Sequence, residues 1–457
     1  LHKNLKDNTN LATWDGELYL EMHRGTFTTK SNLKKANRTL EFKLRETELR
    51  AALASLTGTS YPSEELTECY KKFLLNQFHD ILPGSHIHPV YEDAMNDYRS
   101  VSERLDAMLA LTAGNEYFNS LNFTRSSITF IEDENGAITR HGVKGFWSIP
   151  TLAGLSTGTV AALPSKENWL STEFCDKCDC LVVETPYYRA KLSSDGSFVS
   201  LYDKELDREW VKEGCGFNKL HLYADNPGVY DAWDILPNYK DVQVALNVDK
   251  PLALVSSDGS SAEFAVTFTT EKSTWKMILR FFADSRAIEV ENVVDWDEKH
   301  KLVKVNFGPD VLTRELVCDT SAGFVKRDLT KNTSWQQARF EVCHHKWCDM
   351  SESGSGIAII NEGKYGVGLE KDEISLSLLR ATIRPDITSD IGHHDFCYTI
   401  LPHSGDAVEA QVNKTAMEYN VPLCKSNVTV PAALRDTLNN CGLYLQAMKR
   451  SEDGQYL

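Results

Sequence analysis

The sequence predicts an α+β multidomain fold in which a three-helix bundle is followed by antiparallel β-sandwich domains. Up to about residue 112, apolar residues recur at intervals of three and four, the period of amphipathic helices. After about residue 115 the apolar runs are short, alternating or aromatic-rich, and Gly, Asp, Asn and Ser clusters separate them. Because no helical pattern intervenes between these later runs, antiparallel sandwiches are favoured over β–α–β units.

Three amphipathic helices are expected in the bundle, which covers about 30–112. The first is expected over about 31–56. The second is expected over about 62–83, where Ser63 precedes acidic first-turn residues and a Pro-Gly pair ends the pattern. The third is expected over about 89–111. Short turns join the three segments, as in a helical bundle.

The chain divides into four expected regions. A helical domain covers 1–112, a small β-sandwich 113–178 and a large β-sandwich 179–403. Residues 404–457 are expected to begin a C-terminal β region that is truncated, because the chain stops where a strand-like alternation is starting. Since the sequence also lacks an initial Met, we expect a fragment of a longer protein.

The charge balance argues against two classes of partner. The chain carries 49 basic and 65 acidic residues, a formal net charge of −16, whereas nucleic acids and anionic membranes need a basic surface. No apolar run approaches the length of a membrane span, and the first residues carry no signal-peptide core. We expect neither nucleic acid nor membrane as a partner.

The cysteines indicate a reducing compartment. Eleven residues are too sparse and irregular for a disulfide scaffold, and an odd number leaves one unpaired. Cys175, Cys178 and Cys180 resemble half of a zinc knuckle, but the second pair is missing, so a surface loop or redox-labile thiols are favoured. Five N-x-S/T sequons decide nothing about location without a visible secretion signal.

The stretch NQFHDILPGSHIHP, residues 76–89, carries three histidines and an aspartate around a Pro-Gly turn. Histidine is a good zinc or cobalt ligand, so His79, His86 and His88 could be three ligands of one metal site. A His beside an Asp at a helix end is more often a capping or hydrogen-bonded surface pair. The pattern alone leaves both interpretations open.

Longer motifs occur in a fixed order over nearly the whole chain. They are WDGELYLEMHRGTFTT at 14–29, LLNQFHDILPGS at 74–85, VYEDA at 90–94, YDAWD at 230–234, NTSWQQARFEVCHHKWCDMSE at 332–352, YGVGLEKDEISLSLLRATIRPD at 365–386 and IGHHDFCYTILPH at 391–403. In content and order they resemble α-mannosidases of glycoside hydrolase family 38, in the branch with cytosolic and vacuolar enzymes. Several independent motifs in one order are far more specific than any single motif.

The resemblance implies a fold and a function. It implies a large sandwich of the galactose-mutarotase-like supersandwich type, and retaining hydrolysis of terminal non-reducing α-D-mannose from oligosaccharides, in free oligosaccharide or glycan catabolism. Family members begin with an α/β catalytic domain carrying the nucleophile and the general acid. This chain would supply the middle and C-terminal domains, contain neither catalytic residue and be inactive alone.

The resemblance also implies site residues and a cofactor. His79 corresponds to a ligand of one divalent metal ion, zinc or alternatively cobalt, and Asp80 to a hydrogen-bonding partner of the bound sugar. His86 and His88 fall where the family pattern varies, so no ligand role is carried over to them. The His393-x-Asp395 pair mimics the family's early metal motif, but it lies in a strand-rich region and is rejected.

Further candidates for the sugar pocket are less strongly indicated. The segment with Glu17, His23 and Arg24 borders the pocket by resemblance, and a structural salt-bridge cluster is the alternative. In the YDAWD motif, aromatic faces stack on sugars and carboxylates accept hydroxyl hydrogen bonds, which makes Tyr230 and Asp231 candidates; Trp233 and Asp234 share their pattern. Arg380 could also reach the cleft.

Two classes of function stay open for the sequence. The first is a mannose-releasing hydrolase whose partners are mannose-containing oligosaccharides, in the cytoplasm or alternatively in a vacuole or lysosome. The second is a non-catalytic mannose-binding or scaffolding homologue. Retention of His79 and Asp80, which have a clear role only beside a catalytic domain, favours the first. A homo-oligomer is possible in either case.

Overall fold

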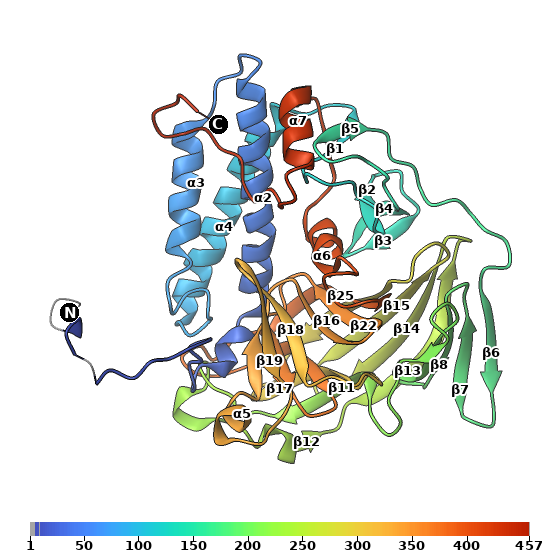
Figure 1. Ribbon diagram of the computed structural model, residues 1–457. Helices are drawn as coiled ribbons and strands as arrows, with labels where there is room; N and C mark the ends of the chain where they lie inside the picture. Colours follow the sequence, from blue (N-terminus) through green and yellow to red (C-terminus); the bar gives the residue numbers. More distant parts are fainter. Residues whose placement is uncertain (1–4, 9, 457) are drawn as a thin grey trace.

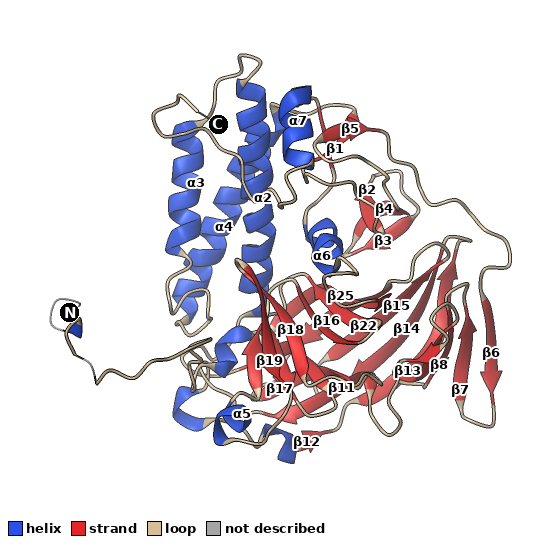
Figure 2. Cartoon of the chain, in the orientation of Figure 1, coloured by secondary structure: helices blue, strands red, loops and turns tan. Residues whose placement is uncertain are grey.

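The computed structural model describes residues 5–8 and 10–456 and places a helical bundle beside a set of antiparallel sheets (Figure 1, Figure 2). A 3₁₀ turn, η1 (Arg24–Phe27), leads into the bundle helices α2 (Ser31–Ser55), α3 (Ser63–Leu75) and α4 (His88–Ala110). The predicted order of a helical bundle followed by antiparallel β-sandwiches is confirmed.

The bundle core follows the predicted three-and-four spacing. Its buried residues come from one face of each helix: Leu33, Leu40, Leu44, Leu66, Cys69, Ala94, Tyr98, Val101, Leu105 and Met108. The burial of these apolar side chains is what holds the helices together, since isolated helices of this length are only marginally stable in water. The predicted first and third helices agree with α2 and α4 to within one residue at each end.

The second predicted helix is too long. It was expected to continue to Pro83, whereas α3 ends at Leu75 and residues 76–84 form successive tight turns. Backbone hydrogen bonds of the tighter i to i+3 type replace the helical ladder, as from Ile81 N to Phe78 O at 2.8 Å. The Lys34 ammonium binds the carbonyls of Leu82 and Pro83 at 2.9 and 3.1 Å. This tertiary contact draws the chain away from the helical path.

A small β region follows the bundle and consists of two three-stranded sheets with the orders β26-β1-β5 and β2-β4-β3. Its strands are β1 (Glu116–Asn119), β2 (Thr129–Glu132), β3 (Ile138–Arg140), β4 (Val143–Ser148), β5 (Ser156–Gly158) and β26 (Cys424–Ser426). The last strand comes from near the end of the chain, so the small region is closed by a segment more than 250 positions downstream.

The large β region contains three antiparallel sheets with the orders β10-β9-β8-β7-β6, β12-β11-β17-β24-β23-β20 and β13-β14-β15-β16-β25-β22-β21-β18-β19. The strands of the first two are β6 (Ser171–Cys175), β7 (Cys180–Glu184), β8 (Tyr188–Leu192), β9 (Phe198–Asp203), β10 (Arg208–Glu209), β11 (Phe217–Ala224), β12 (Gln243–Val244), β17 (Lys301–Phe307), β20 (Glu341–Cys343), β23 (Gly366–Leu369) and β24 (Ile374–Ala381). Those of the nine-stranded sheet are β13 (Asn247–Ser257), β14 (Ser261–Thr269), β15 (Thr274–Phe282), β16 (Ile288–Trp296), β18 (Glu315–Thr320), β19 (Gly323–Asp328), β21 (Trp347–Glu352), β22 (Ser355–Asn361) and β25 (Gly392–Ser404).

The three large sheets share one hydrophobic core. A single cluster of buried side chains contains residues of all three, including Leu192, Phe264, Phe281, Val305 and Leu376. Inward-facing apolar residues of stacked sheets interdigitate in this way in β-sandwiches. Short helices complete the chain: η2 (Gly228–Tyr230), η3 (Tyr239–Asp241), α5 (Ser334–Ala338), α6 (Val412–Asn420) and α7 (Ala432–Asn439).

Two predicted boundaries differ from the structure. The boundary at residue 178 falls inside a hairpin, because Cys175 of β6 pairs with Cys180 of β7 in the five-stranded sheet. The turn-like residues at 176–179 resemble a linker in the sequence, but they connect two strands of one sheet. The predicted C-terminal β region over 404–457 contains two helices and a single three-residue strand.

The C-terminal segment packs back on the bundle instead of starting a new sandwich. Val428, Val430 and Met448 form a cluster with Leu49 and Leu53 of α2. Their alternation resembles a strand, but the apolar side chains bury against a helix. Of the helices in the part of the chain described, none combines the length and apolar character needed to cross a membrane.

Candidate functional site

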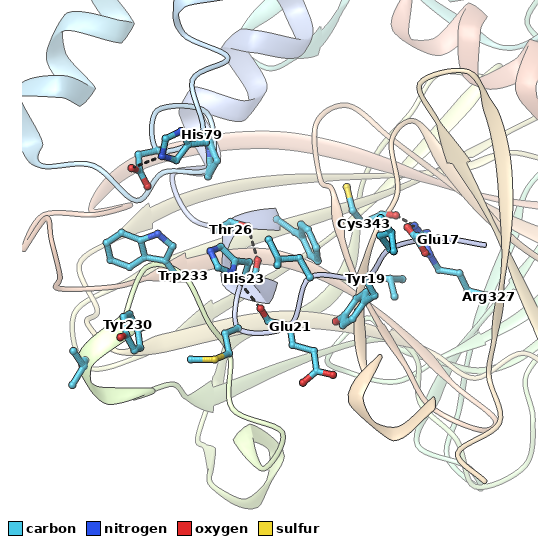
Figure 3. Close-up of a pocket in the computed structure, with 18 residues that line it drawn as sticks. Glu17, Tyr19, Glu21, His23, Thr26, His79, Tyr230, Trp233, Arg327 and Cys343 are labelled. Carbon is cyan, nitrogen blue, oxygen red and sulfur yellow. Dashed lines mark hydrogen bonds and ion pairs between the residues drawn. The ribbon is translucent and has the colours of Figure 1, made fainter. Parts of the chain in front are cut away.

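A cavity of about 1090 Å³ lies where the end of the bundle, the N-terminal segment, one loop of the large β region and its strands β19 and β20 meet (Figure 3). Its walls include residues from each of these parts: Glu17, Tyr19, Glu21, Met22, His23, Thr26, His79, Asp80, Tyr230, Trp233, Arg327 and Cys343. In Figure 3, His79 and Trp233 lie at one end of the cavity and Glu17 and Arg327 at the other, with His23 between them.

His79 and Asp80 are presented by the tight turns that follow α3. His79 Nε2 lies 3.3 Å from Asp80 Oδ2, and the His79 side chain is 77% exposed. Ser85 donates a 2.8 Å hydrogen bond to the other carboxylate oxygen of Asp80, which fixes its orientation. An exposed imidazole with a neighbouring oriented carboxylate is able to bind a ligand without moving the backbone.

Lys34 holds this presenting loop in place from α2. Its ammonium group is buried and hydrogen-bonded to the carbonyls of Thr29, Leu82 and Pro83. Burial lowers the pKa of Lys34 to about 7. One side chain therefore ties the turn after His79 to the segment that enters α2.

The residues at this end of the cavity fit part of a metal site. His79 would supply one imidazole nitrogen, which is a good ligand for zinc or cobalt. Structural and catalytic zinc sites take three or four protein ligands, so one imidazole is only a part of such a site. The donor chemistry at His79 fits a divalent ion, and the ligand set that we describe is incomplete.

The N-terminal segment forms the opposite wall. Glu17 makes a two-pronged ion pair with Arg327, with Nε at 3.0 Å and Nη2 at 2.6 Å from its carboxylate oxygens. The hydrogen bonds from Arg327 lower the pKa of Glu17. Tyr19 donates a 2.5 Å hydrogen bond to the carbonyl of Glu341 in β20. These contacts fasten the segment across the edge of the large β region.

His23 lies in the middle of the cavity wall, where η1 begins. Its Nδ1 lies 3.1 Å from the carbonyl of Glu21, which leaves the rest of the ring facing the cavity. The adjacent Gly25 donates from its backbone N to the carbonyl of Trp233 at 2.9 Å. A side chain at Gly25 would place its Cβ 2.1 Å from Nη1 of Arg380, so only glycine fits between these elements.

Tyr230 and Trp233 come from the loop that contains η2. The Tyr230 side chain is 55% exposed, and the two rings lie edge to face with centroids 6.5 Å apart. Both line the cavity on the side of His79. Exposed aromatic faces of this kind are suited to stacking against apolar faces of a ligand.

Three predicted site residues lie away from the cavity. Arg24 is buried, donates to Asp234 Oδ1 at 3.2 Å and stacks on Phe340 at 4.5 Å. Asp231 is buried and accepts from the backbone N of Ile383 and Arg384 at 2.6 and 3.1 Å. These contacts hold the N-terminal segment and the η2 loop against the β region. Both side chains therefore support the cavity wall without lining the cavity.

Arg380 is the third residue that the structure keeps out of the cavity. It is fully buried, and its Nε donates to Asp225 Oδ2 at 2.5 Å. Its two terminal nitrogens donate to Thr29 and to the carbonyls of Ala232 and Asp234. The guanidinium links the α2 entry to the loop with Trp233. Its predicted contact with a ligand is replaced by a structural role.

The other two histidines of the stretch 76–89, His86 and His88, do not line the cavity. His86 is buried, and burial lowers its pKa. His88 begins α4, and its Nδ1 lies 3.2 Å from Asp386 and 2.9 Å from Thr388 Oγ1. Of the three histidines in this stretch, only His79 therefore lines the cavity.

Sequence reasoning missed Arg327, Tyr19 and Cys343 as cavity residues. Arg327 lies on β19, an edge strand whose sequence GFVKRD gave no sign that the arginine pairs with Glu17 more than 300 positions away. Tyr19 lies within the motif WDGELYLEMHRGTFTT, two residues from Glu17 and two from Glu21. This spacing was a usable signal that the three side chains face the same side of an extended segment. Nothing in the sequence distinguished Cys343 from the other cysteines.

One group of possible metal-binding atoms occurs elsewhere in the part of the chain that the structure describes: His141, Glu362 and Cys397. His141 Nε2 lies 2.6 Å from Glu362, whose other oxygen is 3.4 Å from Arg140, and burial raises the pKa of Cys397. A neighbouring guanidinium and a protonated thiol favour an ion-pair network. All eleven cysteines, including the three on the β6–β7 hairpin, carry free thiols.

Comparisons with known proteins agree with this architecture. Two family models match: "Alpha mannosidase middle domain" over residues 21–114 and "Glycosyl hydrolases family 38 C-terminal domain" over residues 183–388. Alpha-mannosidase 2C1 of Mus musculus is 31% identical over 447 residues, which are 93% of this chain and 42% of that protein. An alpha-mannosidase of Saccharomyces cerevisiae is 30% identical over 92% of this chain and 38% of that protein.

A solved structure supports the fold. The crystal structure of an alpha-mannosidase from Enterococcus faecalis V583 superposes with a TM-score of 0.72 at 12% identity, over 94% of this chain and 61% of that one. The chain spans less than half of the length of the curated relatives named above. Motif order, fold and both family models agree, and the chain belongs to glycoside hydrolase family 38, of which it comprises the α-mannosidase middle and C-terminal domains.

Proposed function

We propose that this chain is part of a retaining α-mannosidase that removes terminal non-reducing α-D-mannose residues from oligosaccharides. The observation that carries the proposal is the position of His79 and Asp80, which face one cavity together with His23, Tyr230 and Trp233. A cavity with aromatic faces and a few oriented polar groups is the usual form of a small-ligand site. The relatives named above carry the name alpha-mannosidase.

The proposed reaction needs two carboxyl groups about 5 Å apart, a nucleophile and a general acid. We place both in the part of the relatives' length that this chain does not match. Glu17 is a poor candidate for either role, since the Arg327 ion pair occupies both of its oxygens. The described residues would then bind and orient the sugar, and the paired carboxyl groups would act on it from the facing side.

His79 is the residue that we propose as a ligand of one divalent ion, zinc or alternatively cobalt. When bound, such an ion would fix sugar hydroxyls and offset charge that develops on the ring. Asp80, held by Ser85, would accept a hydrogen bond from a sugar hydroxyl. Tyr230 and Trp233 would cover an apolar face of the ring and exclude water from it. Free oligosaccharide or glycan catabolism in the cytoplasm, or in a vacuole or lysosome, suits the free thiols of the chain.

Hydrolysis of 4-nitrophenyl α-D-mannoside by the full-length natural protein tests the proposal. We expect release of 4-nitrophenol, with α-mannose as the first product by NMR, since two displacements retain the anomeric configuration. Residues 1–457 expressed alone should release none. If the full-length protein bound mannose without hydrolysing any α-mannoside, the non-catalytic mannose-binding interpretation would replace this one. β-Mannose as first product would contradict retention.

A further inference from the structure

Two more cavities adjoin the first one, the nearer between the bundle and the β region and the farther between the β18–β19 hairpin, α6 and the C-terminal segment. The second has a volume of about 600 Å³ and shares Thr26, Phe27, Pro83 and Cys343 with the first. The third has a volume of about 470 Å³ and shares Ser321, Lys346, Met417 and Gln446 with the second. Neighbouring cavities share wall residues and therefore adjoin each other, and we call this row of three cavities the interface groove.

The groove has elements on both sides. Residues of α2 and α3, such as Arg38 and Phe73, form one side of the second cavity, and His345 with Tyr365 forms the other. The β18–β19 hairpin rises from the edge of the nine-stranded sheet towards the bundle (Figure 1), and its exposed tip residue Ser321 borders both the second and the third cavity.

Aromatic side chains line the groove at intervals. Tyr365 lies in the second cavity under the Arg38 guanidinium, at 4.9 Å. Phe324 and Tyr444 lie in the third cavity, with exposed fractions of 48% and 40%. Aromatic faces that are partly open beside hydrogen-bonding groups offer both stacking and orientation to a ligand with apolar faces and polar edges.

The charged groups of the groove are paired or, in the case of Lys34, hydrogen-bonded to backbone carbonyls. Lys346 pairs with Asp319 at 2.7 Å, and Arg38 Nε lies 3.3 Å from Glu41, although not in hydrogen-bond geometry. Burial lowers the pKa of His345 to about 4, so its ring is neutral near pH 7 and able to accept a hydroxyl hydrogen bond. A groove of this kind suits a neutral polyhydroxyl ligand better than an ionic one.

We propose that the interface groove binds the sugar residues on the reducing side of the mannose held in the first cavity. The inference rests on the proposed function and deepens it, because it makes the substrate an extended mannose oligosaccharide and not a disaccharide. Its basis is the row of three adjoining cavities, the spaced aromatic faces and the paired charges. The β18–β19 hairpin then covers the extended part of the ligand.

Calorimetric binding to the full-length natural protein tests the groove independently of turnover when the ligand is not hydrolysed. The ligands are methyl α-D-mannoside and a linear α-mannotetraose in which sulfur replaces the glycosidic oxygens, so that its linkages resist hydrolysis. We expect the tetraose to bind at least about tenfold more tightly, which corresponds to about 1.4 kcal/mol. Ser321→Trp, which fills the groove from the hairpin tip, should remove this advantage and leave the affinity for methyl α-D-mannoside unchanged.

Matched variants separate the groove from general effects of substitution. Ser194→Trp, in an exposed turn between β8 and β9 that borders none of the three cavities, should bind both ligands like the natural protein. Phe324→Ala should weaken tetraose binding at least threefold, whereas Phe174→Ala, an exposed aromatic of β6, should not. Thermal melting of each variant shows whether it is folded.

Two results overturn the proposal. One is equal affinity for the two ligands, as expected if another segment of the protein fills the groove. The other is a tetraose advantage that survives both Ser321→Trp and Phe324→Ala. Failure of the proposed function would be observed differently. The full-length protein would then bind the tetraose in the groove but hydrolyse no α-mannoside.

Discussion

At the scale of single residues, tertiary contacts decide which arginines line the cavity, and the sequence alone did not predict them. Arg24 and Arg380 were predicted beside the ligand, yet both are buried behind the cavity, and Arg327, which was not predicted, lines it. The Nε of Arg380 finds its carboxylate partner 155 positions away, at Asp225. A sequence shows that an arginine is present near a motif, but the motif does not show on which side of a loop it will lie.

Arg380→Met should destabilise the β region by about 3–5 kcal/mol, because the Asp225 carboxylate remains buried without its partner. Burial already raises the pKa of Asp225, so its charge depends on the guanidinium. Urea unfolding followed by tryptophan fluorescence measures the loss. Arg435→Met, which removes an exposed ion pair with Asp436, is the control and should change stability by less than about 0.5 kcal/mol. A loss below about 1 kcal/mol for Arg380→Met would refute the structural role.

Five of the predicted site residues line the cavity: Glu17, His23, His79, Asp80 and Tyr230. Each belongs to a loop or turn, where polar and aromatic side chains stay accessible. Their predicted roles in binding sugar and metal are proposals that the experiments above test.

At the scale of elements, α2 has two buried faces and the sequence predicted only one. The apolar face forms the bundle core, as the spacing indicated. Outside this face α2 also buries Lys34, Arg38, Arg45 and Arg50, mostly against backbone carbonyls of other segments, as when Arg45 donates to Leu445 at 3.0 Å. Cationic residues at helical spacing normally indicate a solvated face. Carbonyl acceptors from other segments carry no signal in the sequence.

The start of α2 depends on a carboxylate from another part of the chain. Asp390 accepts from the backbone N of Lys30 and of Ser31, both at 2.7 Å, and so replaces the N-cap residue that the local sequence lacks. Asp390→Ala should cost about 2 kcal/mol, since two buried donors lose their acceptor.

The control for this cap is Asp372→Ala, which removes an exposed pair with Lys212 and should cost less than about 0.5 kcal/mol. Hydrogen exchange of the first turn of α2 localises the effect, because only the loss of a cap speeds exchange there. Unchanged exchange in Asp390→Ala would show that the helix start does not depend on this carboxylate.

Acid should weaken the contact next to the cap. Burial opposes ionisation of Asp386, but hydrogen bonds from Lys30 and Thr388 lower its pKa well below the usual range. The unfolded chain therefore takes up this proton at a higher pH than the folded one. The contribution to stability is fully present above about pH 4, the unfolded value, and is lost as the pH falls towards the folded value.

Comparison with Asp386→Asn isolates this contribution. The natural protein should be more stable than the variant at pH 5, and the difference should shrink below about pH 4. Thermal unfolding of both proteins across this range measures it. A difference that grows with acidity would mean that the carboxylate is not stabilised by Lys30 in the folded state.

At the scale of the whole molecule, the order of domains was predictable and the closure of the chain was not. Helical and alternating periods differ strongly, so the change from bundle to sandwich near residue 115 was clear. The return of the C-terminal segment to α2 and β1 pairs elements that are far apart in sequence, as in Phe118 of β1 with Cys424 of β26. Local patterns contain no information about such long-range pairing.

Truncation tests the importance of this return. Removing all residues after Leu423 exposes Leu49, Leu53 and Phe118, which are now buried. We expect a lower melting temperature and aggregation, because an exposed apolar patch promotes association. Removal of the residues after Arg450, which leaves the packed side chains in place, should leave the melting temperature unchanged. Equal melting of both truncated proteins would show that the segment adds nothing to stability.

The central claim is that His79 alone, of the three histidines in its segment, serves a metal-dependent mannosidase site. Elemental analysis of the purified full-length natural protein and its His79→Ala, His86→Ala and His88→Ala variants tests it most directly. His79→Ala should lower metal affinity and α-mannosidase activity at least about 10-fold, the loss typical even for a residue that only supports a ligand. His86→Ala and His88→Ala should retain metal and activity to within about threefold. Equal metal loss in all three variants, or full metal content in His79→Ala, would contradict the account.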